Sequence, residues 1–317
     1  MRPMRSRATL PALAAMIVSC TPSLRSIDAV ASELEQWREP IPSSHPATDR
    51  AILQRAIAVD PYVCSPSAAE IFGGPAERGI RTIHGSMPHY GLYDGPMRYH
   101  VQRTDDGWVV RLRIALRFPP RDTELELPDC SLRERFEGPV RCWGIPFEQA
   151  TGVESCPDVG RFRAKATQHN VSVLLAHWST EAERLWNRDA QRFGLPIRYD
   201  FEFVEAPERG WIDADATLPL EPTCGRTPYF RSLRSGWSIP VLAHEIGHWL
   251  GLLDEYEMLS GIAGFYPKTP FPGAEVSRMG LSMKRETVVL PLHHYLVLRR
   301  YACPEPESRD PYGHLGP

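Results

Sequence analysis

The stretch IPVLAHEIGHWLGLLDEY, residues 239–256, is the most informative part of this 317-residue chain. Its apolar residues recur at helical spacing and gather on one face at about 100° per residue. Pro240 is tolerated in a first helical turn, and Gly251 lets the chain bend after the last turn. We therefore predict a helix over residues 239–251 that buries its apolar face in a core. That face comprises Leu242, Ile246, Trp249 and Leu253.

The opposite face of this predicted helix carries side chains that bind metals. His244 and His248 lie one turn apart and can present two imidazole nitrogens to one Zn²⁺ at about 2.0–2.1 Å each. Glu245 sits just off that face, where it can reach a water on the metal without binding the metal itself. This is the general-base position of HExxH peptidases. The spacing predicts a catalytic zinc site, which needs a third protein ligand and one open position.

Asp254 is the predicted third ligand. Gly251 permits a left-handed bend that swings a side chain three residues later back toward the metal. Two alternatives stay open. In the first, Asp254 orients a histidine while Glu255 binds the metal; in the second, a glutamate from a later helix binds it, as in a thermolysin-like site. The later candidates are Glu275 and Glu286.

The stretch from His244 to Asp254 resembles the metzincin signature HExxHxxGxxH/D, in the variant with aspartate as third ligand found in snapalysin-like peptidases. The resemblance is confined to residues 239–300. Within it, Met279 in the run Ser-Arg-Met-Gly is similar to the methionine of the family's Met-turn, and Met283 is a weaker candidate.

The resemblance extends to two further features near the carboxyl end. Residues 290–301 resemble the family's C-terminal helix. Leu281 stands where some metzincins place a tyrosine that stabilises the transition state. The candidates for that role in this chain are Tyr256 and Tyr266.

What the resemblance implies about fold is an α+β zincin domain of the metzincin type over residues 96–303. We expect a twisted mixed sheet, mostly parallel, with a backing helix near residues 180–193 and the active-site helix near 239–251. The cleft should run between the upper edge of the sheet and a lower subdomain that contains the Met-turn.

The segments upstream of the motif give a compatible order of elements. Residues 98–118 alternate apolar residues with arginine around a turn at Asp105-Asp106-Gly107, which predicts a hairpin. Residues 171–178 are interpreted as a strand before the helix at 180–193, although one long helix also fits their spacing. Residues 197–204 alternate as a strand. Residues 61–97 and 205–238 are predicted to be loop or irregular structure.

The amino terminus predicts export and lipid anchoring. Basic residues precede an apolar run at residues 8–18 that is too short to span a bilayer, as in a signal peptide. The run ends in Ile-Val-Ser-Cys, similar to a bacterial lipobox, so Cys20 is the predicted lipidation site. Residues 1–19 are then the signal peptide, and 20–95 a tether with an N-terminal loop, or a pro-segment. The protein is expected on the bacterial cell envelope, at the outer membrane or the cell surface.

The remaining six cysteines suggest up to three disulfides in an exported protein. They are Cys64, Cys130, Cys142, Cys156, Cys224 and Cys303. Cys64 is expected in a bridge, with a cap on the metal as the alternative. Residues 119–165 are predicted to be an insertion pinned by cysteines, and residues 304–317 a flexible tail.

Several other residues receive structural interpretations. His293 and His294 are expected to serve packing and surface roles, and Asp213 and Asp215 to be solvated loop carboxylates that bind no calcium. The tryptophans are expected to anchor the core. They are Trp178, Trp186, Trp211, Trp237 and Trp249.

The predicted function is zinc-dependent hydrolysis of peptide bonds by a monomeric, lipid-anchored endopeptidase, with proteins or peptides as substrates. The lipid would be its only link to a membrane, and a formal net charge of −3 offers no electrostatic basis for binding nucleic acid. Two alternatives remain: a zinc hydrolase of non-protein amides such as cell-wall peptide, and a non-catalytic surface lipoprotein with a structural zinc site.

Overall fold

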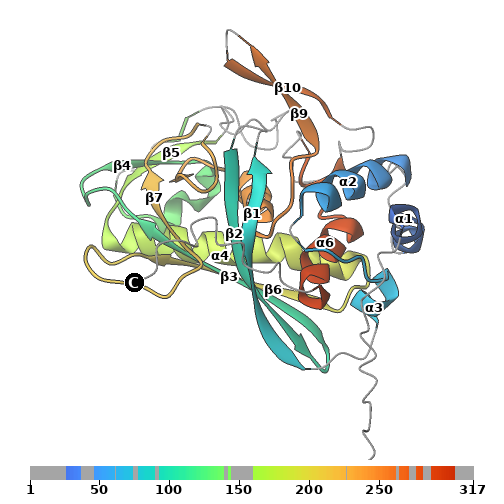
Figure 1. Cartoon of the computed structure of the whole chain (residues 1–317). Helices are drawn as coiled ribbons and strands as arrows, with labels where there is room; N and C mark the ends of the chain where they lie inside the picture. Colours follow the sequence, from blue (N-terminus) through green and yellow to red (C-terminus); the bar gives the residue numbers. More distant parts are fainter. Residues whose placement is uncertain are drawn as a thin grey trace, which may run out of the picture.

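The computed structural model describes residues 26–36, 46–60, 62–73, 78–89, 93–138, 142–143, 160–225, 227–261, 264–270, 276–280 and 287–303. The fold is α+β with a mixed sheet, which confirms the predicted fold class at that level (Figure 1). No helix within these ranges is long and apolar enough to cross a bilayer.

The main sheet is built around β3 (Gly107–Arg117). Along one edge, β3 pairs in parallel with β6 (Ile197–Glu205). Its other edge is shared, because β2 (Tyr93–Thr104) pairs antiparallel with the first half of β3 and β7 (Ala216–Glu221) pairs in parallel with the second half. The outer strands are β1 (Gly79–His89), antiparallel to β2, and β8 (Leu233–Arg234), parallel to β7.

The hairpin predicted over residues 98–118 is present as β2 and β3, joined at Asp105-Asp106-Gly107. Gly107 has a φ of 136°, and a Cβ there would collide with the Pro196 carbonyl, so only glycine fits this turn. The prediction of loop over residues 61–97 is wrong, since β1 and the first part of β2 form a long antiparallel ribbon there. The irregular segment 205–238 likewise contains β7 and β8.

Helix α4 (Gln168–Arg192) replaces the predicted strand and helix. Buried residues recur along it with a period near 3.6, from Val171 to Ala190, so the alternative of one long helix was the correct one. Thr167 caps it by accepting a hydrogen bond from Asn170 N at 3.2 Å. Trp178 and Trp186 of this helix pack edge-on against Phe203 and Phe201 of β6, which fixes α4 across the sheet.

The amino-terminal region is folded onto the carboxyl-terminal helix α6 (Pro291–Ala302). It contains α1 (Ile27–Glu35), α2 (Pro46–Val59) and α3 (Ala68–Phe72), which surround α6 on one side of the molecule (Figure 1). Two features fasten it there. Asp60 lies 2.6 Å from Arg299 and 2.7 Å from Arg300, all three buried, and Cys64 is disulfide-bonded to Cys303.

The structure tests part of the prediction that the six cysteines form disulfides. Besides Cys64–Cys303, Cys130 is bonded to Cys142, with Cα atoms 5.9 Å apart, and Cys224 is also disulfide-bonded. The bridged status of Cys64 leaves no thiolate to cap a metal. Cys130 opens the short helix η1 (Cys130–Arg135) in the predicted insertion, which also holds the antiparallel strands β4 (Glu124–Leu127) and β5 (Phe162–Lys165).

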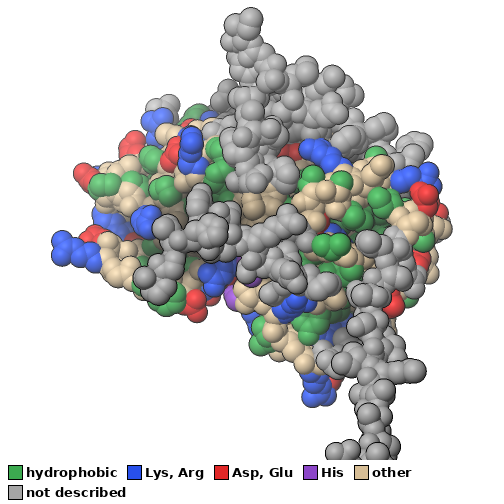
Figure 2. Space-filling view, viewed as in Figure 1, with side chains coloured by type: hydrophobic (Ala, Val, Ile, Leu, Met, Phe, Trp, Pro, Cys, Tyr) green, Lys and Arg blue, Asp and Glu red, His purple; other side chains and the backbone are tan. Residues whose placement is uncertain are grey.

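Four of the five tryptophans anchor the core as predicted, but Trp211 does not. It lies in the loop between β6 and β7 with 83% of its surface exposed. The surface that Figure 2 shows carries basic and acidic side chains interspersed among apolar ones over its described part. On the outer face of the sheet these charges pair locally, for example Arg113 with Glu202 at 2.9 Å.

Some predictions lie outside the described residues: Cys20 and the signal peptide, the tail 304–317, and the alternative site residues Glu275, Glu286, Leu281 and Met283. Strands β9 (Tyr256–Gly261) and β10 (Gly264–Pro270) form a hairpin that projects from the body in Figure 1. Only the backbone of Tyr256 and Tyr266 is described, so their predicted catalytic role stays a prediction.

Candidate metal centre

Helix α5 (Ile239–Trp249) carries the HExxH motif and is buried on all sides. Its apolar face packs into the core, where Trp186 of α4 donates a hydrogen bond to Ala243 O at 3.1 Å. The helix ends at Trp249 with Leu250 as its C-cap, and Gly251 follows with a φ of 80°. A Cβ at Gly251 would collide with Met97 and Arg300, so both the bend and the close packing require glycine.

The two histidines of α5 are oriented by hydrogen bonds from one side of each ring. His244 Nδ1 lies 2.9 Å from Arg278 O, and His248 Nδ1 lies 2.8 Å from Leu252 O. A carbonyl oxygen only accepts hydrogen bonds, so each Nδ1 carries a proton. In the neutral imidazole, the Nε2 atoms of both rings then hold lone pairs, as metal-ligating histidines require.

Both Nε2 atoms point at the same carboxylate oxygen. Asp254 Oδ1 lies 3.2 Å from His244 Nε2 and 3.4 Å from His248 Nε2, and these three atoms form a compact group of potential ligands. Asp254 Oδ1 is buried and makes no hydrogen bond among the described residues. Four ligands at about 2.0–2.2 Å around a tetrahedral Zn²⁺ lie about 3.3–3.6 Å from one another. The spacing of this group therefore suits one such ion.

The electrostatics of the group favour a positive charge beside the Asp254 carboxylate. Burial works to raise the pKa of Asp254, yet the two imidazoles hold it well below its usual value. Burial works to lower the pKa of His248, yet Asp254 and Glu245 raise it to about 9. Either a proton on His248 or a metal ion can supply this charge. A metal ion could be bound by all three atoms at once.

Glu245 lies beside this group without belonging to it. The side chain is buried, with 8% of the residue exposed. Its charge raises the pKa of His248 and also that of Tyr229, which burial raises further still. The helix thus places a buried carboxylate close enough to His248 and Tyr229 to raise the pKa of each.

Tyr229 is a site residue that the sequence did not reveal. Its ring lies over His248, with centroids 5.2 Å apart, and its hydroxyl donates a hydrogen bond to Pro96 O at 2.6 Å. It comes from the segment between β7 and β8, which has no periodicity or motif. No pattern in the sequence pointed to it, because the contact exists only through tertiary packing.

Met279 lies directly beneath α5. A Cβ added to Gly247 would collide with its sulfur, so the glycine of the HExxH helix makes room for this methionine. The turn that carries Met279 supplies two backbone acceptors: Arg278 O for His244, and Met279 O for Glu255 N at 2.9 Å. The residue that the resemblance designated as the Met-turn methionine is thus in contact with the motif helix.

Glu255, the alternative third ligand, is engaged elsewhere. Its Oε1 lies 2.5 Å from His293 Nε2. Leu290 N donates to His293 Nδ1 at 3.0 Å, so the proton of His293 sits on Nε2 and is donated to Glu255. His294 is also buried, 2.6 Å from the Tyr199 hydroxyl, so neither histidine has the predicted surface role.

Asp215 departs from its predicted role as a solvated carboxylate. Its side chain is only 3% exposed and lies 3.1 Å from His100 Nε2. Arg113 N donates to its second oxygen at 2.9 Å. Burial raises the pKa of Asp215, and the hydrogen bond from Arg113 and the neighbouring His100 oppose that effect. It serves to join β2, β3 and the loop before β7.

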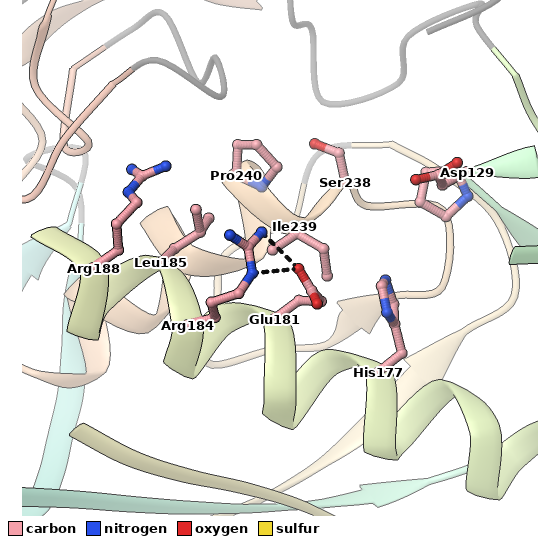
Figure 3. A pocket seen from close by; sticks show the side chains of 10 residues that line it. Asp129, His177, Glu181, Arg184, Leu185, Arg188, Ser238, Ile239 and Pro240 are labelled. Carbon is pink, nitrogen blue, oxygen red and sulfur yellow. Dashed lines mark hydrogen bonds and ion pairs between the residues drawn. The ribbon is translucent and has the colours of Figure 1, made fainter. Parts of the chain in front are cut away.

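A cavity of about 360 Å³ lies at the start of α5, away from the histidine pair. In Figure 3, α4 lines it with His177, Glu181, Arg184 and Arg188, and Ser238 and Pro240 form the opposite wall. The charged groups on α4 are already paired, Arg184 with Glu181 at 2.7 Å and Arg188 with Asp189 at 2.6 Å. The lining of the cavity therefore does not concentrate charge of one sign.

In this site, the oriented imidazoles of His244 and His248 converge on the carboxylate of Asp254. The carboxylate of Glu245 lies beside this group, and Met279 packs against the helix that carries the two histidines. Comparison of the chain with models of known families, with curated proteins and with solved structures yields no match in any of the three.

Proposed function

We propose that the chain binds Zn²⁺ through His244, His248 and Asp254 and hydrolyses peptide bonds with Glu245 as general base. One observation carries the proposal: the Nε2 atoms of His244 and His248 converge on one carboxylate oxygen of Asp254, at 3.2 and 3.4 Å. Two nitrogens and one carboxylate oxygen are also the donor set of known catalytic zinc sites, which keep a fourth position open.

Zinc bound at this site would acidify a water molecule and polarise the scissile carbonyl. The residues of the chain divide the remaining tasks. Arg278 O and Leu252 O hold the two imidazoles in the correct tautomer and orientation. Glu245 accepts a proton from the attacking water and passes it to the leaving amine, for which its place beside the ligands, rather than among them, is suited.

The resemblance to metzincins belongs to this proposal. It is supported by the contact between Met279 and Gly247 and by the left-handed bend at Gly251 that brings Asp254 to the histidines. Export and lipidation at Cys20 complete the proposal and rest on the amino-terminal sequence alone. The enzyme would then act on proteins or peptides at the cell envelope.

A digest of a diverse peptide mixture by the full chain, read by mass spectrometry, tests the proposal. We expect cuts that disappear with a chelator and in Glu245→Gln, while Glu202→Gln, an exposed carboxylate on β6, cleaves like the parent. Metal content is measured on the same samples.

The other outcomes select between the alternatives. Stoichiometric zinc with no cut peptides, but with hydrolysis of cell-wall peptide, would assign a non-protein amide as substrate. Stoichiometric zinc with neither activity would assign a structural site, and a protein that takes up no zinc would refute the proposal.

A further inference from the structure

The peptide group that joins Asp254 to Glu255 is held at both of its polar ends. Arg55 Nη1 donates a hydrogen bond to Asp254 O at 2.9 Å. Glu255 N donates to Met279 O, also at 2.9 Å. The two partners come from distant parts of the chain, α2 and the turn at residues 277–280. Together they fix the plane of this peptide and with it the direction in which the Asp254 side chain leaves the backbone.

Helix α2 is seated against the segment that carries Asp254. Ile52 and Ala56, on the same side of α2 as Arg55, are buried, and with Arg55 they line one small pocket shared with Leu252, Leu253, Asp254, Glu255, His293 and Leu296. The pocket has almost no free volume, about 10 Å³, so the two surfaces are in close contact. Arg55 itself is exposed, and its contact with the site is the part-buried hydrogen bond to the Asp254 carbonyl.

The end of α2 reinforces the same turn by a second route. Asp60 pairs with Arg300, whose guanidinium donates to Leu250 O at 3.0 Å and Gly251 O at 2.9 Å. These carbonyls lie at the carboxyl end of α5, where a cation is favoured by the helix dipole. The bend at Gly251 is thus tied through Arg300 to the amino-terminal region, three residues before the ligand that Arg55 holds.

We infer that Arg55 is a positioning residue for the metal ligand Asp254, and that α2, which carries it, supports the metal centre. The inference rests on the proposed function. Asp254 follows the end of α5 and receives no orientation from the helix itself. Partners that orient ligands in this way typically change metal affinity by about 10–100-fold when removed.

Zinc affinity of the full chain, measured by competition with a chromophoric chelator, tests the inference. Arg55→Met keeps the apolar stem and removes the donor, so we expect zinc to bind about 10–100-fold more weakly. Arg55→Lys retains a donor, so its zinc affinity should lie between those of the parent and Arg55→Met. Arg50→Met is the matched control on the same helix, because Arg50 pairs with Asp28 at the surface, and it should bind zinc like the parent.

A double-mutant cycle separates positioning from a general loss of stability. If Arg55 acts through Asp254, adding Arg55→Met to Asp254→Ala should produce no further loss of zinc affinity. The spectrum of the Co²⁺-substituted protein should change with Arg55→Met and not with Arg50→Met.

The outcomes also distinguish this inference from the proposed function. Parent-like affinity in Arg55→Met, or an equal loss in the presence and absence of Asp254, would overturn the role of Arg55 while leaving the zinc site in place. A parent protein that binds no zinc would instead refute the proposed function, and the inference with it.

Discussion

The two halves of the candidate metal centre are held in different ways. His244 and His248 share one helix, so their spacing follows from helical geometry, and a single carbonyl completes the orientation of each ring. Asp254 lies beyond the helix end, and its backbone is held by Arg55, 199 residues away in the chain, and by the Met279 turn. Local structure positions one half, and long-range contacts position the other.

The two halves should therefore respond differently to mutation. The helical half should tolerate changes in the amino-terminal region, because α5 sets the spacing of its histidines and the carbonyls that orient them, Arg278 O and Leu252 O, lie outside that region. The assembled half should respond to changes far from the metal. Mutations in the two halves can therefore test whether α5 alone sets one half while distant contacts set the other.

Glu245→Gln removes the proposed base from the helical half without disturbing its geometry. We expect peptide hydrolysis to fall by about 10²–10⁴-fold, the usual contribution of general acid–base catalysis, with zinc content unchanged. Initial rates and metal analysis on one preparation measure both. His248→Ala is the companion variant and should lose zinc as well. A Gln variant as fast as the parent would show that the proton has another acceptor.

Asp60→Asn removes the negative charge that pairs with Arg299 and Arg300 behind the assembled half. It leaves Arg299 and Arg300 buried beside an uncharged partner, so we expect a loss of about 3–5 kcal/mol in the free energy of unfolding. Urea denaturation monitored by tryptophan fluorescence measures it. A loss as small as that from a surface pair would mean that the arginines are satisfied by carbonyls alone.

The same carboxyl predicts a pH dependence. Burial works to raise the pKa of Asp60, but Arg300 and Arg299 together hold it below the ordinary value of 3.8. Its stabilising contribution is therefore complete above that value and is lost as the pH falls through the lowered pKa of the folded state. Stability measured below pH 4 should fall more gently in Asp60→Asn than in the parent. Parallel acid profiles would contradict this assignment.

Gly247→Ala tests the contact between the two halves. The new Cβ meets the Met279 sulfur, so we expect a destabilisation of about 1–3 kcal/mol, as for other overpacked cores. Thermal unfolding measures it. Met279→Ala alone should also destabilise the fold, because it leaves a cavity, but the double variant should lose less than the sum of the two single losses, because the smaller side chain makes room for the new Cβ. A double variant whose losses simply add would show that the two residues do not interact.

Arg50→Met should have the smallest effect. Arg50 and Asp28 are both largely exposed, and surface pairs contribute about 0–1 kcal/mol. The melting temperature and zinc affinity should stay close to those of the parent. A marked loss of zinc affinity here would mean that any disturbance of α2 affects the site, and would remove the contrast with Arg55.

Some of the structure was predictable because its causes are local. The helix at residues 239–249, the hairpin at Asp105-Asp106-Gly107 and the strand after Pro196 follow from periodicity and turn residues. Residues 171–178 were misread because a short apolar run fits both periods, and the core that α4 shares with β6 decided between them. The loop predicted over residues 61–97 failed because several of its glycines and prolines, such as Gly85 and Pro96, lie within a paired ribbon.

The spacing along one helix and the conformational freedom of glycine were enough to predict the histidine pair, the neighbouring Glu245 and the bend at Gly251. Three features follow instead from tertiary packing: Asp254 joins the histidines while Glu255 turns to His293, Tyr229 lies over His248, and Arg55 holds the backbone of Asp254. The physical reason is that a residue outside a regular element takes its direction from whatever packs against it.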